Sequence, residues 1–164
     1  MLDDAQQQLL LRLPPSAFDD DRGTWGIVIA QTHWLRGDRA RARAYADSSR
    51  IAIEQQLTAT PDNAQQRVFL GLALAYMGRK ADAIREGERA VAADPISKDG
   101  YTGPYLQHQL VRIYLLVGEP EKALDQLEPL LKIPYHLSPG WLRIDPTFAP
   151  LKGNPRFERL VAGK

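Results

Sequence analysis

The chain has 164 residues, no cysteine and a formal net charge of +1, with 25% charged and 44% hydrophobic residues. This length is typical of a single domain, and the composition is that of a folded chain rather than a disordered one. A net charge close to zero argues against long-range steering toward nucleic acid. The absence of cysteine excludes disulfides, thiolate metal sites and a cysteine nucleophile.

The sequence contains no apolar run of the roughly 18 residues that a membrane-spanning helix needs. Its first residues are polar, unlike the start of a signal peptide. We therefore expect no membrane contact by this segment and a cytoplasmic location, which the lack of cysteine also favours. A membrane-anchored parent protein or a periplasmic segment is the alternative.

The first predicted helix covers residues 3–13, where an apolar stripe ends at Pro14-Pro15. No partner helix precedes it. Residues 1–15 are therefore either an N-terminal helix that caps the array or the second half of a repeat that begins upstream.

A pattern that recurs about every 40 residues follows this helix. A forward shift of 40 residues places Leu70 on Leu110 and Gly78 on Gly118, and a backward shift of 41 places Gly78 on Gly37. Each copy has a helical apolar pattern, a glycine, and then an alanine that opens a second apolar pattern. The period predicts an all-α fold of three helix pairs. The copies cover residues 22–61, 64–97 and 104–136, and their predicted helices cover 21–36, 39–57, 62–77, 80–93, 104–117 and 120–132.

The middle copy explains why small residues recur at these positions. Gly71 and Ala83 are small where two antiparallel helices cross, so the two backbones can approach closely. Gly78 follows a helix end, where a left-handed residue satisfies the last carbonyl groups. We expect Thr60 to cap the helix 62–77, with Pro61 at its first position.

The spacing of the middle copy resembles that of the tetratricopeptide (TPR) repeat. The resemblance implies a TPR-like α-α superhelix, a right-handed solenoid of antiparallel helix pairs. The first copy is degenerate because its second helix runs beyond the standard length, and the third has Val111 in place of the first glycine. The matching residues are Leu70, Gly71, Leu74, Gly78, Ala83, Ala90 and Pro95.

Residues 137–164 form a tail rich in proline and aromatic residues, with a predicted short helix at 155–162. We expect this tail to cap the exposed apolar face of the last repeat, using Trp141, Leu142, Phe148, Leu151, Phe157 and Leu160.

The tail, with Gly103-Pro104-Tyr105 and the run 117–124, looks like the C-terminal TPR region of bacterial multidomain regulators. In that group, similar arrays follow a serine/threonine kinase, a nucleotide-cyclase or a winged-helix domain. The resemblance covers residues 60–164 and includes no catalytic motif. It implies the regulatory or scaffolding part of a larger signalling protein.

Enzyme motifs are absent from the sequence: there is no phosphate-binding glycine loop, no Gly-x-Ser-x-Gly and no His-Glu-x-x-His. The three histidines lack metal-ligand spacing. We therefore expect no catalytic residue, no cofactor and no metal. An arginine cluster within residues 36–50 is best interpreted as a solvated helix face rather than a nucleic-acid site, because no aromatic residues are interleaved with it.

The resemblance implies that a partner binds in the concave groove lined by the first helix of each repeat. These positions are apolar and aromatic with one clear cation, Arg112, which suits an extended or helical peptide better than a carboxylate clamp. The alternatives are that these side chains belong to the core, that the module serves homodimerisation without a peptide ligand, or, least favoured, that an active site surrounds His108 and Arg112. The groove candidates are Gln31, Trp34, Gln65, Val68, Leu72, Tyr76, Tyr105, His108 and Arg112.

Overall fold

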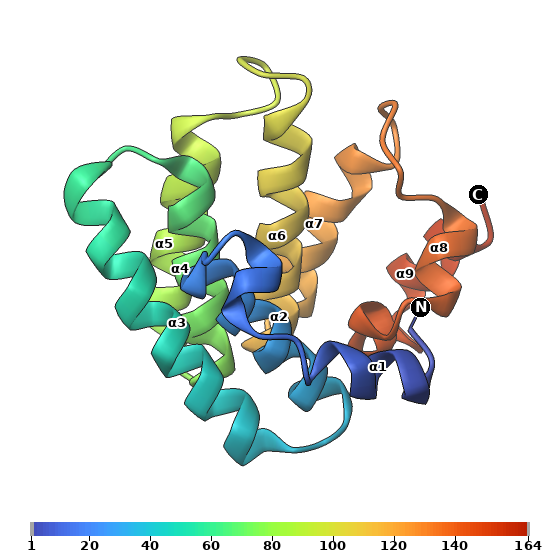
Figure 1. The fold of residues 1–164 in the computed structure, drawn as a ribbon. Coiled ribbons are helices and arrows are strands. Elements are labelled where there is room, and N and C mark those ends of the chain that lie inside the picture. Colours follow the sequence, from blue (N-terminus) through green and yellow to red (C-terminus); the bar gives the residue numbers. More distant parts are fainter. Residues whose placement is uncertain (1, 164) are drawn as a thin grey trace.

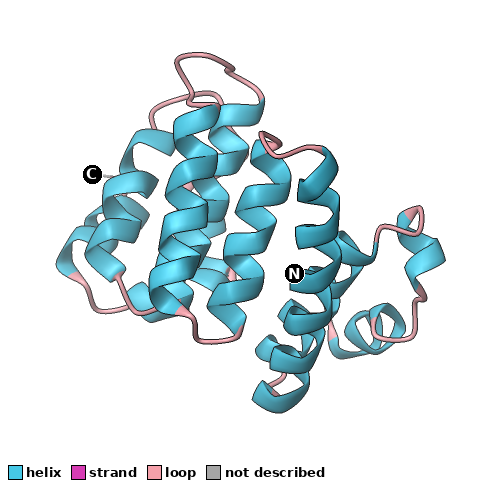
Figure 2. Cartoon of the chain, turned by 90° about the vertical axis from the view of Figure 1, so that its left-hand side faces the viewer, coloured by secondary structure: helices cyan, strands magenta, loops and turns pink. Residues whose placement is uncertain are grey.

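The computed structural model describes residues 2–163, which fold into helices joined by short loops (Figures 1 and 2). No strand occurs within this range, so the all-α expectation is confirmed. None of the described helices combines the length and the apolar character needed to cross a bilayer. The elements are α1 (Asp4–Leu10), the 3-10 helix η1 (Pro15–Phe18), α2 (Arg22–Leu35), α3 (Arg39–Ala59), α4 (Ala64–Tyr76), α5 (Lys80–Ala93), α6 (Thr102–Leu116), α7 (Pro120–Leu130), α8 (Pro139–Ile144), the 3-10 helix η2 (Pro146–Leu151) and α9 (Pro155–Val161).

Three antiparallel helix pairs form the body of the molecule: α2 with α3, α4 with α5, and α6 with α7 (Figure 1). The two most extensive helix–helix contacts are those of α2 with α3 and of α4 with α5. Further contacts of α3 with α4, of α4 with α6 and of α5 with α6 join each pair to the next. The six predicted helices in this region match the observed ones to within two residues at each end. The chain is therefore an α-helical repeat structure.

The same turn ends the first helix of every pair. Gly37, Gly78 and Gly118 have φ angles of 80°, 78° and 76°. After Gly78, the amide of Arg79 donates to the carbonyl of Leu74 at 2.9 Å, which is the 6→1 hydrogen bond of a Schellman motif. Because a side chain is disfavoured at positive φ, the recurring glycine of the sequence is explained by this turn.

The crossing of α4 and α5 depends on Gly71. A Cβ atom built there would lie 3.0 Å from the carbonyl oxygen of Ala83 and 2.8 Å from Cδ1 of Ile113. The glycine therefore lets α4 approach α5 and α6 at the same point. In the third pair Val111 takes the corresponding place and is fully buried.

Two helix starts differ in how well the sequence predicted them. Asp21 caps α2, and its side chain accepts from the amides of Gly23 and Thr24. The expected cap at Thr60 is wrong. The helix α3 continues to this residue, whose amide donates to the carbonyl of Gln56, so Thr60 ends α3 instead of opening α4. Asn63 caps α4, and its side chain accepts from the amide of Gln66 at 2.9 Å.

The C-terminal tail folds back onto the last helix pair. Leu142, Phe148, Leu151 and Phe157 are buried in one core cluster with residues of α6 and α7. Ion pairs join Arg156 to three carboxylates of α7, at 2.8–3.0 Å. Through these contacts the tail packs on α6 and α7. Its elements α8 and η2 were not predicted as helical.

The crossing at Gly71 generates a test. Gly71→Val places two methyl groups against Ala83 and Ile113, so we expect the free energy of unfolding to fall by about 1–3 kcal/mol. Gly100→Val is the matched control, because a Cβ at Gly100 meets nothing within 4 Å, and a change within about 0.5 kcal/mol is expected. Urea unfolding followed by circular dichroism measures both. Equal losses in the two variants would contradict the role of Gly71.

Candidate functional site

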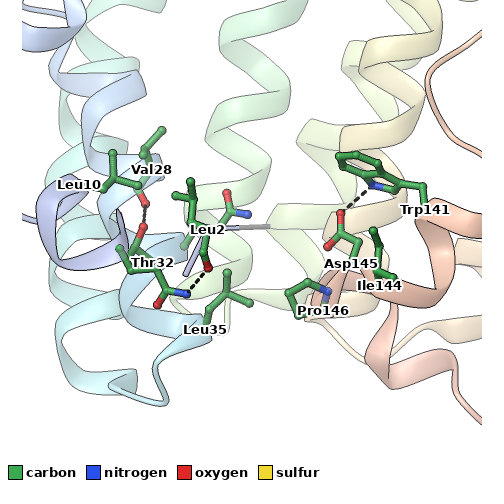
Figure 3. Close-up of a pocket in the computed structure, with 11 residues that line it drawn as sticks. Leu2, Leu10, Val28, Thr32, Leu35, Trp141, Ile144, Asp145 and Pro146 are labelled. Atoms are coloured by element: carbon green, nitrogen blue, oxygen red, sulfur yellow. Dashed lines mark hydrogen bonds between the residues drawn. The ribbon is translucent and has the colours of Figure 1, made fainter. Parts of the chain in front are cut away.

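Two adjacent hollows lie where the first helices of the pairs meet the C-terminal tail. The larger one, the tail pocket, has a volume of about 280 Å³ and two walls (Figure 3). One wall comes from the N-terminal segment and α2, and the other from α8 and the start of η2, so the two walls come from opposite ends of the chain. The first wall consists of Leu2, Gln7, Leu10, Val28, Gln31, Thr32 and Leu35, and the second of Trp141, Ile144, Asp145 and Pro146.

Exposed apolar side chains concentrate in the tail pocket. Leu2, Leu35, Trp141 and Ile144 are 47%, 42%, 41% and 59% exposed, and they are four of the seven large hydrophobic side chains that are exposed among residues 2–163. Trp141 was expected to cover the last repeat, and the structure instead places it at this opening. Clustered apolar exposure of this kind marks surfaces that bind a partner.

The second hollow, the groove pocket, has a volume of about 170 Å³. It shares Gln31, Leu35 and Pro146 with the tail pocket, so the two hollows are neighbours. Its other lining residues come from α2 to α4, α6 and η2, and they are Trp34, Arg39, Tyr76, Arg112, Leu115, Leu116, Thr147 and Pro150.

Arg112 connects two helix pairs at the groove pocket. Its guanidinium donates to the amide oxygen of Gln109 at 2.6 Å and to that of Gln31, on α2, at 2.7 Å. Burial raises the pKa of the neighbouring Tyr76 hydroxyl, while the charge of Arg112 opposes this shift. The guanidinium group of Arg112 therefore contacts neutral groups, the two glutamine amides and the Tyr76 hydroxyl.

A second arginine, Arg39, also lines the groove pocket. The Cζ atom of Arg39 is 3.4 Å from the centre of the Trp34 ring, and one of its nitrogens donates to the Trp34 carbonyl at 3.0 Å. The ring of Trp34 also packs edge-on against Tyr76, with 5.5 Å between ring centres. The stacking on Trp34 therefore holds the Arg39 guanidinium in the lining of the groove pocket.

Asp145 is the one acidic residue that lines the tail pocket in the described part of the chain. Its carboxylate accepts from the indole nitrogen of Trp141 at 3.0 Å and from the amide of Thr147 at 2.9 Å. The dashed line in Figure 3 marks the contact with Trp141. Asp145 thus caps η2 and fixes the orientation of the indole ring that forms part of the wall.

Four of the nine predicted groove residues come together at the groove pocket. They are Gln31, Trp34, Tyr76 and Arg112, which lie on α2, α4 and α6. The repeat register therefore brought side chains together that are up to 81 positions apart in the sequence.

Three predicted residues on α4 lie elsewhere. Val68 and Leu72 are fully buried in the core, so their expected place in the groove is wrong. The cause is the central position of α4, which packs against α2, α3, α5 and α6. Gln65 is exposed and lines a separate small hollow with Phe69 near the start of α4.

The two remaining residues lie on α6 and are covered. His108 is buried, its ring stacks on Phe148 of η2 with 6.2 Å between centres, and its Nδ1 lies 3.2 Å from the Tyr135 hydroxyl. Burial lowers the pKa of His108 to about 3. Tyr105 is half-buried and packs against Phe69 at 6.5 Å. Phe148 of the tail therefore covers His108, and Phe69 of α4 covers part of Tyr105.

Among the residues that line the tail pocket, only Gln31 was predicted from the sequence. The proline-rich aromatic tail and the apolar stripe of residues 3–13 were both visible as patterns. They indicated caps, because nothing in a local pattern shows that two ends of a chain face each other. Residues such as Val28, Trp141 and Ile144 become neighbours only when the array curves.

Comparisons with protein-family models, with curated proteins and with solved structures found no match to this chain. The case for a function therefore depends on the geometry and charge of the two pockets.

The burial of His108 generates a pH prediction. In the folded state its pKa is about 3, against about 6.5 in the unfolded chain. Between these values the unfolded state binds more protons, so stability falls as the pH falls below 6.5, by about 1.4 kcal/mol per pH unit. We expect the free energy of unfolding to drop by about 2 kcal/mol more in the natural chain than in His108→Gln between pH 7 and pH 5.

Urea unfolding of both proteins at the two pH values measures this difference. The comparison cancels the carboxyl groups, which titrate in both chains. An identical pH dependence, or an NMR titration of the folded protein that places the His108 midpoint between pH 6 and 7, would contradict the prediction.

Proposed function

We propose that the chain is a non-enzymatic protein–protein interaction module, which binds a peptide segment of a partner protein in the tail pocket and the groove pocket. The observation that carries the proposal is the convergence of Leu2, Leu35, Trp141 and Ile144 on one opening. Exposed leucine, isoleucine and tryptophan side chains cost solvation free energy when they stay in water, and a bound apolar side chain removes that cost.

The repeat architecture supports a TPR-like module. Three stacked helix pairs, the turn at Gly37, Gly78 and Gly118, and the close crossing at Gly71 are the features that the repeat spacing predicted. A curved array of this type presents an extended inner surface to a partner. We propose further, on the resemblance stated for the sequence, that it is the regulatory or scaffolding part of a larger bacterial signalling protein.

The division of the site into two hollows favours a peptide ligand. Their volumes are about 280 and 170 Å³. Two small adjacent hollows suit successive side chains of one peptide. The polar side chains at hand are also engaged in structural contacts, Asp145 with Trp141 and Arg112 with Gln31, which supports binding rather than catalysis.

A pair of matched variants tests the tail pocket. Random peptides displayed on phage are selected against the intact chain, and the enriched peptides are synthesised with blocked ends. We expect Ile144→Gln to weaken the binding of these peptides about tenfold or more, because an apolar contact is lost. Ile51→Gln is the control: Ile51 is an exposed isoleucine on α3 and lines neither pocket.

Calorimetry gives the dissociation constants, and thermal unfolding verifies that both variants are folded. If the peptides bind Ile144→Gln as tightly as the natural chain, the tail pocket is not their binding site. A selection that enriches no peptide would count against the proposed function itself.

Self-association is the second candidate, and one observation favours it. The helix α1 contains no buried residue, and Leu9 on it is 63% exposed. A second copy of the chain could cover this helix. If it does, light scattering will show a mass that rises with protein concentration, and Leu9→Glu will abolish the rise. A monomer at every concentration would exclude this alternative.

A further inference from the structure

We propose that the partner segment carries an acidic side chain close to its apolar anchor, and that Arg112 and Arg39 in the groove pocket bind this carboxylate while the apolar side chain fills the tail pocket. This inference rests on the proposed function and specifies the chemistry of the ligand. It is carried by the charge of the groove pocket and by the way the two pockets adjoin.

Arg112 differs from every other half-buried arginine among residues 2–163. Arg50 pairs with Asp47 at 2.8 Å, Arg67 pairs with Glu86 at 3.0 Å, and Arg156 pairs with three carboxylates of α7. Arg112 has no carboxylate within 4.0 Å in this part of the chain, and its two hydrogen-bond acceptors are neutral glutamine amides. Among residues 2–163, Arg112 is therefore the half-buried arginine that has no carboxylate partner.

The lining of the groove pocket as a whole carries positive charge without negative charge. Its described lining includes Arg39 and Arg112 but no aspartate or glutamate. Gln31 and Gln109 hold the Arg112 guanidinium in place, and Trp34 holds that of Arg39 by stacking. A guanidinium has five N–H donors, so Arg112 retains donors for a ligand. Fixed cations without a counter-charge favour an anionic group on the partner.

The arrangement of the pockets fixes where that group lies in the peptide. Because Gln31, Leu35 and Pro146 line both hollows, one peptide can occupy both at once. Side chains two residues apart in an extended strand point the same way and lie about 7 Å apart, and those three or four apart in a helix lie about 5–6 Å apart. We therefore expect the acidic residue within about four positions of the apolar anchor.

The test uses the blocked peptides that the natural chain selects. We expect them to combine a large apolar residue with aspartate or glutamate, and replacement of that residue by its amide to weaken binding about tenfold. Arg112→Gln should weaken the acidic peptide to the same extent and leave the amide peptide unaffected. In the double-mutant cycle, the two changes together then cost no more than either one alone.

Two further measurements keep the inference testable if Arg112→Gln does not fold. Arg39→Gln alters an exposed side chain and should weaken the acidic peptide selectively. Raising the salt concentration from about 0.05 to about 0.5 M should weaken the acidic peptide and not the amide peptide, because only the former makes an ion pair.

The outcomes separate this inference from the proposed function. Selected peptides that need Ile144 but contain no acid, and that bind Arg112→Gln unchanged, would overturn the inference and leave the interaction module standing. Tight binding of an amide peptide only when its C-terminal carboxylate is left free would overturn the assignment to a side chain. If Ile51→Gln weakens peptide binding as much as Ile144→Gln does, both this inference and the proposed function are overturned.

Discussion

The packing of Phe148 against α6 is the contact on which the rest of the candidate site depends. This side chain is fully buried, stacks on His108 and belongs to the core cluster that joins α6 and α7 to the tail. Because it anchors η2 on the inner side of the last pair, the segment before it runs back toward α2. Without that anchor, Trp141 and Ile144 would have no fixed position, and the tail pocket would lack its second wall. The tail is thus both the cap of the array and part of its binding surface.

The sequence predicted those features that follow from short-range periodicity. The helix pairs, their glycine turns and the small residue at Gly71 all came from spacing along one chain segment, and the structure confirms them. Errors arose wherever a third element decided the outcome. Val68 and Leu72 were expected in the groove but are buried because α4 packs against four other helices. Thr60 does not cap α4 because α3 continues to it. The two walls of the tail pocket are more than a hundred residues apart, so no local pattern could have joined them.

The tail pocket provides the hydrophobic contribution to peptide binding, and the groove pocket distinguishes acidic peptides from neutral ones. Apolar side chains in the tail pocket supply binding free energy that is largely independent of sequence. The arginines of the groove pocket add a requirement for charge, because a partner without a carboxylate leaves their solvation incomplete. Neutral partners hold both cations in place, Trp34 by stacking and the two glutamines by hydrogen bonding. The same residues therefore preorganise the site without neutralising it, which lowers the entropic cost of binding.

The proposed binding site joins segments from opposite ends of the chain. The most direct measurement is an NMR titration of the labelled, full-length protein with a selected peptide, followed at every backbone amide. We expect the signals of residues 28–35 and of residues 141–146 to shift together, with one common dissociation constant, while those of the outer faces of α3 and α5 stay in place. Shifts confined to one of the two segments, or to α3 and α5, would contradict this expectation.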